Sequence, residues 1–369
     1  MGKAHARSIL GDKVKGCRLA AIADIDEKVR GEFPDTPYFS TAGEMIASGK
    51  IDAILIATPH YDHTTIGIAA LEAGLHVLVE KPISVHKADA EKLIAAYTNP
   101  KQVFAAMFNQ RTDPAYRKVR SLIQKGELGP IRRVNWIITD WFRTEAYYAS
   151  GGWRATWGGE GGGVLLNQCP HQLDLFQWLF GVPAKVHGFC SFGKYHDIEV
   201  EDDVTAYFTY PSGATAVFVT STGECPGTNR LEVTADRGKV VVEDRKITFY
   251  RTEEPVQEFS KTTPGGFTKV DHWTIDIPIQ GFGGQHLTIM QNFTNAILNG
   301  EELIAPAVEG IHSVEIANGI LLSSFTGQPV EFPLDAEAYE AVLKKKIAES
   351  TFVKKTAPKG PTTDFDQSF

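Results

Sequence analysis

Lys81 and His171 are the two side chains whose surroundings best suit the transfer of a proton. A general base works best when its pKa lies near the working pH. A histidine meets this condition unaided, whereas a lysine meets it only when burial or a neighbouring cation lowers its pKa. Lys81 follows the apolar stretch 76–80 and precedes Pro82, so it stands at the end of an expected buried strand. Because a lysine is costly to bury, we expect Lys81 to act on a substrate rather than to be a solvated charge.

His171 belongs to a polar cluster around the start of an expected helix. Asn167 lies four residues before it and Asp174 three residues after it, so on a helical turn the three side chains share one face. Asp174 could orient the imidazole ring, whereas Asn167 cannot take up a proton but can hydrogen-bond a hydroxyl group. The alternative for His171 is a hydrogen-bonded core histidine. We expect His171 to be the base, Lys81 to polarise the substrate hydroxyl, and Asn167 to bind substrate.

Zinc is the rival chemistry for this cluster. Cys169, His171 and Asp174 carry ligand atoms that zinc uses. Cys169 and His171 alternate as on a strand, however, while the expected helix begins near Pro170. No second Cys/His pair stands at a spacing typical of a zinc site, and we therefore expect no metal.

An aromatic and glycine-rich segment, 147–157, precedes the cluster. Sites for sugars use aromatic faces against C–H surfaces and polar donors for hydroxyl groups. We therefore expect Tyr148, Trp153 and Arg154 to contact the substrate, the alternative being a structured surface loop. His286, at the start of an expected helix after two glycines, is a further candidate for the pocket.

A dinucleotide-binding pattern is visible near the N-terminus. Such a site needs a strand, a G-x-G-x-x-G turn, a helix, and an acid about 20 residues further on that accepts hydrogen bonds from ribose hydroxyls. Asp24 lies 22 residues after Gly2 and closes the apolar stretch 18–23, and Gly2 fits the last glycine of the turn. The alternative for Asp24 is an ordinary loop acid. Ile25 follows Asp24, and no arginine stands there to meet a 2′-phosphate, which favours NAD, with NADP possible.

The first 108 residues are typical of a doubly wound parallel sheet, in which helices alternate with strands buried on both faces. We expect strands at 18–24, 51–57, 76–80 and 102–107, and helices at 3–10, 40–48, 63–73 and 87–97. Ligands of such sheets bind outside the carboxyl ends of the strands.

From residue 109 onward strands dominate, and several alternate apolar and polar residues as half-exposed antiparallel strands do. We expect strands at 131–139, 184–191, 203–210, 214–221, 229–235, 238–243 and 246–250, and helices at 114–125, 170–180 and 285–299. The sequence therefore predicts a dinucleotide-binding domain over 1–108, an α+β domain with a large, mostly antiparallel open sheet over 109–350, and a polar tail over 351–369.

Two segments resemble the signatures of the Gfo/Idh/MocA oxidoreductase family. The first comprises 52–59, His63 and the stretch ALEAGLHVLVEKP over 70–82, and the second is GGGVLLNQCPHQLD over 161–174. The resemblance covers roughly residues 2–330. It implies a Rossmann-type first domain, a second domain whose open sheet packs in homo-oligomers (dimers or tetramers), and oxidation of sugars, sugar derivatives or cyclic polyols with NAD(P).

The resemblance also implies a role for each matching position. Gly2 would end the phosphate loop, and Asp24 would hold the adenosine ribose. Glu80 and Lys81 would lie near the nicotinamide and its ribose. The remaining positions that it assigns to the cofactor are Thr58, Pro59, His63, Asn109 and Arg111.

The sequence departs from the family at two places. The family has a strand and the first part of the glycine turn before Gly2, so we expect a sequence begun at an internal methionine, with this first strand missing. The alternative is a real deletion of this strand, which would weaken the case for NAD binding. The family usually has aspartate where Asn167 stands, so the usual Lys–Asp–His proton relay is not available. The motif Asn-Gln-x-Pro-His-Gln-x-Asp over 167–174 resembles that of a subgroup that acts on sugars and glycosides, including members that oxidise the C3 hydroxyl.

Composition narrows the class of protein. The chain has 369 residues and a formal net charge of −8, which argues against a general binder of nucleic acid or of anionic membranes. Four cysteines without CxxC spacing, and no visible secretion signal or long apolar run, indicate a reduced, cytoplasmic protein.

The sequence therefore predicts an NAD(P)-dependent oxidoreductase that oxidises a secondary hydroxyl of a sugar, glycoside or cyclic polyol. Two alternatives stay open. One is an NAD-assisted glycosidase of the same fold, in which the sugar is oxidised, eliminated, hydrated and re-reduced. The other is a non-catalytic sensor of sugar or NAD.

Overall fold

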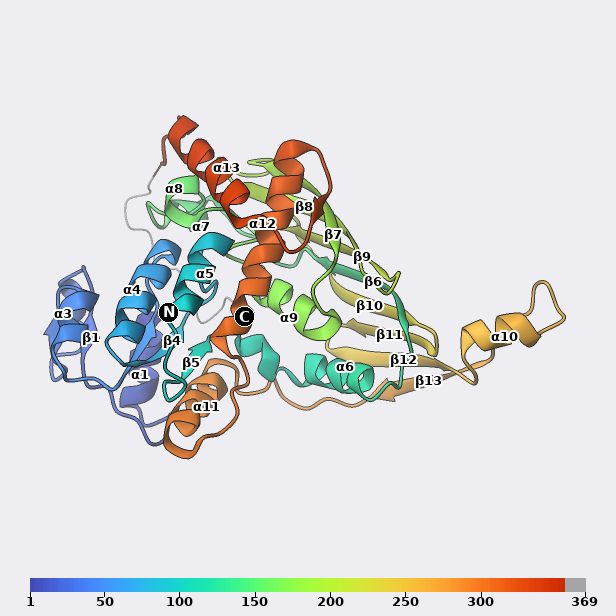
Figure 1. Cartoon of the computed structure of the whole chain (residues 1–369), viewed down its shortest axis with the longest axis horizontal. Coiled ribbons are helices and arrows are strands. Elements are labelled where there is room, and N and C mark those ends of the chain that lie inside the picture. The colour runs from blue at the N-terminus through green and yellow to red at the C-terminus, as the bar shows by residue number, and fades with distance from the viewer. Residues whose placement is uncertain (356–369) are drawn as a thin grey trace.

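The computed structural model describes residues 1–355, and the first 108 of them form helices around short parallel strands (Figure 1). The strands are β1 (Ile22–Ala23), β2 (Tyr38–Phe39), β3 (Ala53–Ile56), β4 (His76–Val79) and β5 (Phe104–Ala106). The helices are α1 (Gly2–Leu10), α2 (Lys28–Glu32), α3 (Ala42–Ala47), α4 (His60–Glu72) and α5 (Lys87–Ala95). One parallel sheet has the order β3-β4-β5, and β1 and β2 form a separate parallel pair. The predicted alternation of strands and helices is confirmed, although the strand expected over 18–24 is limited to β1.

The second half of the described chain is built on a nine-stranded sheet of order β13-β12-β11-β10-β6-β9-β8-β7-β14. β6 and β9 are parallel, and the other neighbours are antiparallel. The strands are β6 (Ile131–Ile138), β7 (Lys185–Phe192), β8 (Glu201–Thr209), β9 (Thr215–Ser221), β10 (Asn229–Ala235), β11 (Gly238–Glu243), β12 (Lys246–Thr252), β13 (His272–Ile277) and β14 (Val330–Glu331). The predicted large, mostly antiparallel sheet is thus confirmed.

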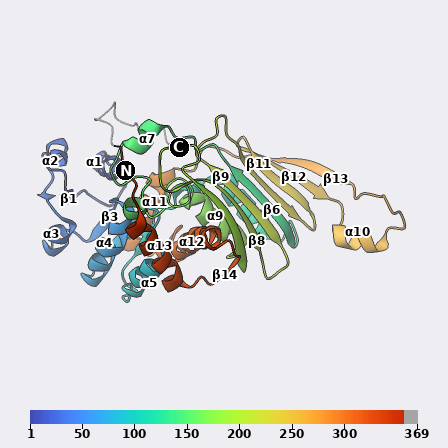
Figure 2. The same ribbon diagram turned by 90° about the horizontal axis from the view of Figure 1, so that it is seen from above.

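Helices cover one face of this sheet, and the other face is exposed (Figure 2). The helices of this half are α6 (Pro114–Gln124), α7 (Glu145–Ala149), α8 (Trp157–Glu160), α9 (Pro170–Phe180), α10 (Val256–Thr262), α11 (Gln285–Asn299), α12 (Gly310–Thr326) and α13 (Ala336–Glu349), with 3-10 turns η1 (Asn109–Thr112) and η2 (Ala307–Glu309). In β8, Ala206 and Phe208 are buried, whereas Thr205 and Tyr207 are exposed. This alternation is the one expected of a sheet with a single covered face.

The sequence did not predict α10, α12, α13 or β13. α12 packs against β7 and α9 and is buried along most of its length. A helix buried on nearly all sides lacks the polar face that makes a helical period visible in a sequence. Gly188 permits the close approach of α12, because a Cβ at this position would lie 2.5 Å from the carbonyl oxygen of Ile320.

One large hydrophobic core surrounds β3, β4 and β5, and a second large core lies under the nine-stranded sheet. The boundary between them does not fall at residue 108. Ile289, Met290 and Phe293 of α11 pack in the same core as β3, β4 and β5. The carbonyl oxygen of Ala305 accepts a hydrogen bond from the Ala106 N–H, so the chain after α11 also lies beside β5. The N-terminal core therefore includes residues that the prediction assigned to the second domain. A periodic pattern identifies an apolar helix face, but it does not identify the core that receives this face.

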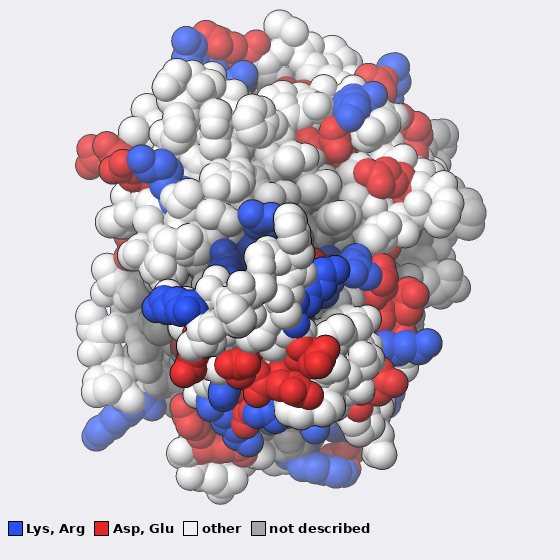
Figure 3. Space-filling view, turned by 90° about the vertical axis from the view of Figure 1, so that its right-hand side faces the viewer, with Lys and Arg blue, Asp and Glu red and all other residues white. Residues whose placement is uncertain are grey.

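One face of the molecule shows a mixed distribution of charge. On the face from which α10 projects, Lys and Arg are interspersed with Asp and Glu, and no basic stripe is visible there (Figure 3). Within residues 1–355, no helix combines the length and the apolar character that a membrane span requires. Most of the predicted tail, residues 356–369, lies outside the described part of the chain.

Glu201 at the start of β8 fixes the glycine-rich segment before α9. One oxygen of its carboxyl group accepts hydrogen bonds from the N–H groups of Gly163 and Leu165, at 2.8 and 3.0 Å. A Cβ at Gly163 would lie 2.0 Å from the Glu201 carbonyl oxygen, so this approach requires glycine. The second carboxyl oxygen is buried and has no hydrogen-bond partner within the described residues. Burial raises the pKa of Glu201 to about 7.

The raised pKa of Glu201 predicts a specific dependence of stability on pH. Between the ordinary value of 4.5 and the folded value of about 7, the folded protein keeps a proton that the unfolded chain releases. The free energy of unfolding should therefore fall as the pH rises through this window. Glu201→Gln keeps an accepting oxygen and should remove roughly 2–3 kcal/mol of this fall, measured by urea unfolding at about pH 5 and about pH 8. The exposed Glu254→Gln is the control, and an unchanged fall in Glu201→Gln would contradict the assignment.

Candidate active site

A cavity lies at the carboxyl ends of β3 and β4, between the two halves of the chain. Among the predicted site residues, those that line it are Thr58, His63, Glu80, Lys81, Trp153, Arg154, Asn167, His171 and His286. The other residues that line it are Met1, Ala57, His60, Trp141, Arg143, Tyr147 and Gln168. The structure therefore brings together the two chemically suited side chains, Lys81 and His171.

Lys81 stands directly after β4, and its peptide bond to Pro82 is cis. The Lys81 Nζ atom donates a hydrogen bond to the main-chain oxygen of Asn167 at 2.7 Å, so the two halves of the chain meet at this contact. Burial lowers the pKa of Lys81, whereas the nearby carboxylates of Glu80 and Glu160 raise it. Two carboxylates close to the ammonium group, one in the cavity wall and one behind it, thus compensate its charge.

His171 lies in the first turn of α9, and its side chain is buried. Neither of its ring nitrogens has a hydrogen-bond partner within the described residues. Burial lowers the pKa of His171 well below its ordinary value, and the charges of Lys81 and His286 lower it further. The imidazole is therefore neutral and keeps a free lone pair, which can accept a proton from a bound hydroxyl group. The two unpaired nitrogens do not fit the alternative of a hydrogen-bonded core histidine.

Glu80 is a buried carboxylate beside Lys81. Its Oε1 atom lies 2.7 Å from Nε2 of His5. Burial by itself would raise the pKa of Glu80, but the hydrogen bond and charge of His5, together with His286 and Lys81, lower it to about 2. The His286 ring lies 5.4 Å from the His5 ring, and burial lowers the pKa of His286 to about 4. Glu80 therefore stays ionised and gives this end of the cavity a fixed negative charge.

Asn167 connects several parts of the cavity wall. Besides the main-chain contact to Lys81, its side-chain nitrogen donates a hydrogen bond to Glu160. Its side-chain oxygen accepts one from the Tyr147 hydroxyl at 3.4 Å. Arg154 donates to the same hydroxyl at 2.9 Å and lies over the Tyr147 ring.

His63 holds together the loops that follow β3 and β4. Its ring nitrogens lie 2.7 and 2.9 Å from the main-chain oxygens of Pro82 and Thr58. Pro59 precedes the first residue of α4 in the first of these loops. His63 and Pro59 therefore shape the cavity edge on which the sequence placed the cofactor.

Three residues that the sequence assigned to the cofactor, Gly2, Asp24 and Asn109, lie outside the cavity wall. Asp24 is half-buried at the carboxyl end of β1, and its carboxylate accepts a hydrogen bond from the Asp26 N–H at 2.8 Å. Gly2 opens α1, and a Cβ there would make an ordinary contact with Ala57 at 3.5 Å. Asn109 is fully buried: its side-chain nitrogen donates to Gln285, while its side-chain oxygen has no hydrogen-bond partner within residues 1–355.

Arg111 and Asp174 contact each other rather than the cavity. The Arg111 guanidinium donates two hydrogen bonds to the Asp174 carboxylate, at 2.7 and 2.6 Å, and a third to Glu309 at 2.5 Å. Both members of the pair are about 1% exposed. The prediction that Asp174 orients the His171 ring is wrong, because this carboxylate is occupied by Arg111 and by Gln177.

Tyr148 also points away from the cavity. Its side chain is buried in the second core, and its hydroxyl pairs with that of Thr222 at 2.8 Å. The neighbouring Tyr147 lines the cavity instead. Two adjacent aromatic residues in one helical turn point in different directions, and the sequence does not show which of them faces a ligand.

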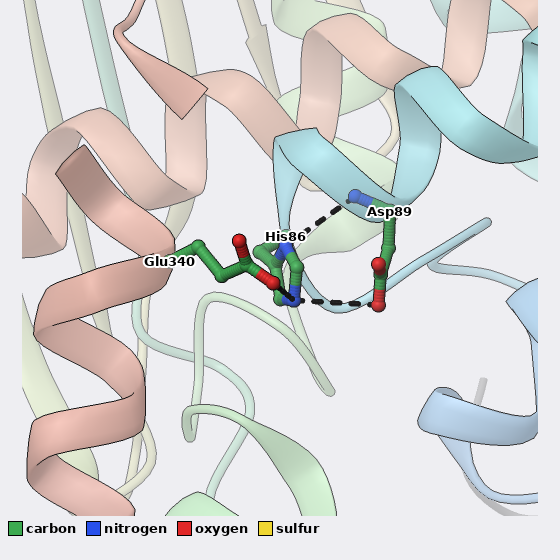
Figure 4. Close-up of side chains that lie close together, drawn as sticks. All are labelled: His86, Asp89 and Glu340. Carbon is green, nitrogen blue, oxygen red and sulfur yellow. Dashed lines mark hydrogen bonds and ion pairs between the residues drawn. The ribbon is translucent and has the colours of Figure 1, made fainter. Parts of the chain in front are cut away.

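The described residues contain one cluster of close potential metal ligands, and it lies outside the cavity wall. His86, Asp89 and Glu340 place their ligand atoms within 4.8 Å of one another, where α5 meets α13 (Figure 4). Lys92 pairs with Asp89 at 2.8 Å and Lys344 with Glu340 at 2.9 Å. His86 also caps α5, because its Nδ1 atom accepts a hydrogen bond from the Asp89 N–H. These contacts account for the cluster as a polar link between two helices.

Several residues of the site were not found from the sequence. They are His5, His60, Trp141, Arg143, Tyr147, Glu160 and Gln168. Glu160 had a usable signal, since an acid directly before the glycine stretch 161–163 breaks an otherwise uncharged segment. The others reach the cavity through loops and helices whose direction the sequence does not specify.

Two family models match the chain. The model of an oxidoreductase family with an NAD-binding Rossmann fold matches residues 1–108, and that of the GFO/IDH/MocA C-terminal domain matches residues 116–241. Together they match more than half of the chain.

Two curated relatives illustrate the range of similarity. The chain is 33% identical over 183 residues to the uncharacterized oxidoreductase YdgJ of Escherichia coli, which covers 49% of this chain and 51% of the relative. It is 23% identical over 332 residues to an inositol 2-dehydrogenase of Rhizobium meliloti, which covers 88% of this chain and 93% of the relative. The chain therefore spans about half the length of the first relative and most of the second.

Solved structures share the fold. The WlbA dehydrogenase from Bordetella pertussis, in complex with NADH and UDP-GlcNAcA, has a TM-score of 0.73 and 24% identity, over 90% of this chain and 96% of that chain. A levoglucosan dehydrogenase in complex with NADH and levoglucosan has a TM-score of 0.74 and 20% identity, over the same shares.

The Arg111–Asp174 pair predicts a large effect on stability. Arg111→Met leaves the Asp174 carboxylate buried without its partner, and the free energy of unfolding should fall by about 3–5 kcal/mol. Lys92→Met, which removes the partly exposed pair with Asp89, should cost less than about 1 kcal/mol. Urea unfolding of both variants measures the difference. A similar small loss for the two variants would show that the buried pair does not hold the structure together.

Proposed function

The chain belongs to the Gfo/Idh/MocA family of NAD-binding oxidoreductases, and we propose that it oxidises a secondary hydroxyl group of a sugar, glycoside or cyclic polyol. One observation carries this proposal. In the cavity, a buried neutral imidazole with two unpaired nitrogens, His171, lies in the same wall as the ammonium group of Lys81. Oxidation of an alcohol needs a base for the hydroxyl proton and an acceptor for the hydride.

The residues present suit a nicotinamide dinucleotide as the hydride acceptor. The cavity lies at the carboxyl ends of parallel strands, where such sheets bind dinucleotides. Asp24 would hold the adenosine ribose, and Thr58, Pro59 and Glu80 would border the nicotinamide half. A bound nicotinamide would supply the acceptor for the hydride that leaves the carbon bearing the hydroxyl group. Ile25, which is 93% exposed beside Asp24, offers no charge to a 2′-phosphate, so we favour NAD over NADP.

The chain's own residues divide the remaining tasks. His171 accepts the hydroxyl proton, because its nitrogens face no other partner within the described chain. Lys81 donates a hydrogen bond to the same hydroxyl oxygen and stabilises the negative charge that develops on it. Asn167 binds a hydroxyl group of the substrate.

The walls of the cavity favour a polyhydroxylated substrate. Trp153, Tyr147 and Trp141 supply aromatic faces, and Arg154 supplies donors beside them. Aromatic faces suit the C–H surface of a sugar, and charged or amide groups suit its hydroxyls. The substrates named for two relatives, inositol and levoglucosan, belong to the same class of polyhydroxylated compounds.

We further propose that the exposed sheet face forms a homo-oligomer. Phe189 is 58% exposed and Tyr207 45% exposed on strands of that face. Exposed aromatic side chains on a flat sheet are typical of an interface with a second copy.

The assignment of His171 is tested with NAD or NADP and a panel of sugars, glycosides and cyclic polyols, followed by the absorbance of reduced nicotinamide. With a substrate found in this way, His171→Ala should lower kcat by at least about 100-fold, because it removes the general base. Binding of NAD, measured by calorimetry, should change little. His272→Ala, an exposed histidine outside the cavity wall, is the control, and full activity of His171→Ala would reject the base assignment.

The same experiment separates the alternatives. Hydrolysis of a glycoside without net formation of reduced cofactor would assign an NAD-assisted glycosidase. Binding of NAD and of sugar without either reaction would assign a sensor. We favour catalysis because a neutral imidazole and the Lys81 ammonium group line the same cavity, which supplies both a base and a donor for one hydroxyl group.

A further inference from the structure

Glu160 is a buried carboxylate that lies just behind the cavity wall. It is the last residue of α8, its side chain is 1% exposed, and the proposed reaction gives it no role. Burial raises the pKa of Glu160, while Arg154, the Ala155 N–H, Asn167 and Lys81 lower it. A carboxylate is costly to bury, so its contacts show what it holds in place.

The two carboxylate oxygens of Glu160 hold two different groups, and one of these, Asn167, lines the cavity. Oε2 accepts a hydrogen bond from the Ala155 N–H at 2.6 Å, at a residue with a positive φ of 54°. Oε1 accepts a hydrogen bond from the side-chain nitrogen of Asn167. The main-chain oxygen of the same asparagine accepts the hydrogen bond of Lys81 at 2.7 Å. Asn167 therefore stands between a buried carboxylate and the proposed catalytic ammonium group.

The contact with Glu160 decides which end of the Asn167 amide faces the cavity. An asparagine amide offers an acceptor at one end and a donor at the other, and its neighbours choose between the two orientations. A carboxylate accepts only, so it holds the nitrogen and turns the oxygen the other way.

Tyr147 independently supports this orientation. Its hydroxyl oxygen already accepts hydrogen bonds from Arg154 at 2.9 Å and Gln168 at 3.2 Å. The hydroxyl proton then needs an acceptor, which the Asn167 side-chain oxygen supplies at 3.4 Å. That oxygen keeps a second lone pair for a hydroxyl group of a ligand.

We propose that Glu160 is a positioning residue: through Asn167 it fixes an acceptor oxygen toward the substrate and holds the adjacent Lys81 ammonium group in place. The inference rests on the proposed function, which supplies the substrate hydroxyl. It adds a specificity rule, because a site built to accept a hydrogen bond from one hydroxyl group discriminates against substrates that lack it.

The decisive variants exchange the carboxylate and the amide. In Glu160→Gln, one amide oxygen cannot serve both Ala155 and Asn167, so the Asn167 amide is free to turn its nitrogen toward the cavity. In the double variant Glu160→Gln/Asn167→Asp, the Gln oxygen accepts from the Ala155 N–H and its nitrogen donates to the new aspartate. Every contact is then satisfied, and the aspartate presents an acceptor to the cavity in either orientation.

With a substrate of the wild-type enzyme, Glu160→Gln should lower kcat by about 10- to 100-fold and leave NAD affinity unchanged. The double variant should recover most of this loss. Glu145→Gln, an exposed glutamate of the same segment, should behave as wild type. Wild-type kcat in Glu160→Gln, or a double variant no better than the single one, would overturn the proposal. If the single variant does not fold, the double variant carries the test, and its inactivity overturns the proposal.

A readout without turnover separates this proposal from the proposed function. The reactivity of the Lys81 amine in the free enzyme, followed against pH by amine labelling and mass spectrometry, reports the pKa of this lysine. The Lys81 pKa should fall by about one unit in Glu160→Gln, return to the wild-type value in the double variant and stay unchanged in Glu145→Gln. If no sugar is oxidised by the wild type, the proposed function fails and this measurement alone decides the role of Glu160. An unchanged Lys81 pKa in Glu160→Gln would overturn it.

Discussion

The partial burial of the Lys81 ammonium group is the constraint on which the rest of the site depends. An ammonium group that loses water needs acceptors and negative charge close by. Here the acceptor is the main-chain oxygen of Asn167, and Glu80 and Glu160 supply the charge. Asn167 and Glu160 come from the second half of the chain, so the surroundings of Lys81 are complete only when the two halves are packed together.

A second buried charge fixes the position of α9. Arg111 lies in η1, shortly after the last strand of the N-terminal sheet. Its guanidinium group pairs with Asp174 on α9, the helix that also carries His171. The fork of two parallel hydrogen bonds fixes the helix in distance and in rotation. Because α9 is held in this way, His171 reaches the cavity without a hydrogen bond to its ring. The imidazole is therefore positioned by its helix and by packing, and both nitrogens remain available to a ligand.

Local patterns of the sequence predicted much of this arrangement. The apolar stretches around residues 51–57 and 76–80 form parallel strands, because a strand buried on both faces must be apolar throughout. The position of Lys81 after such a strand placed it at the carboxyl edge of the sheet, where the cavity lies. Asn167 and His171 were likewise assigned to one site, and both line the cavity. In each case a short stretch contains the whole signal.

The sequence by itself therefore determined the order of elements, the two sheet types, and the identity of Lys81 and His171 as the chemically suited pair. Only the tertiary structure decided which charged residues compensate one another: Arg111 pairs with Asp174, and Glu160 holds Asn167. It also decided that α11 joins the first core and that Tyr147 rather than Tyr148 lines the cavity. The physical reason is range. The apolar period of a strand or helix depends on residues that are close in sequence. The partner of a buried charge lies many residues away, and the packing of the whole chain selects it.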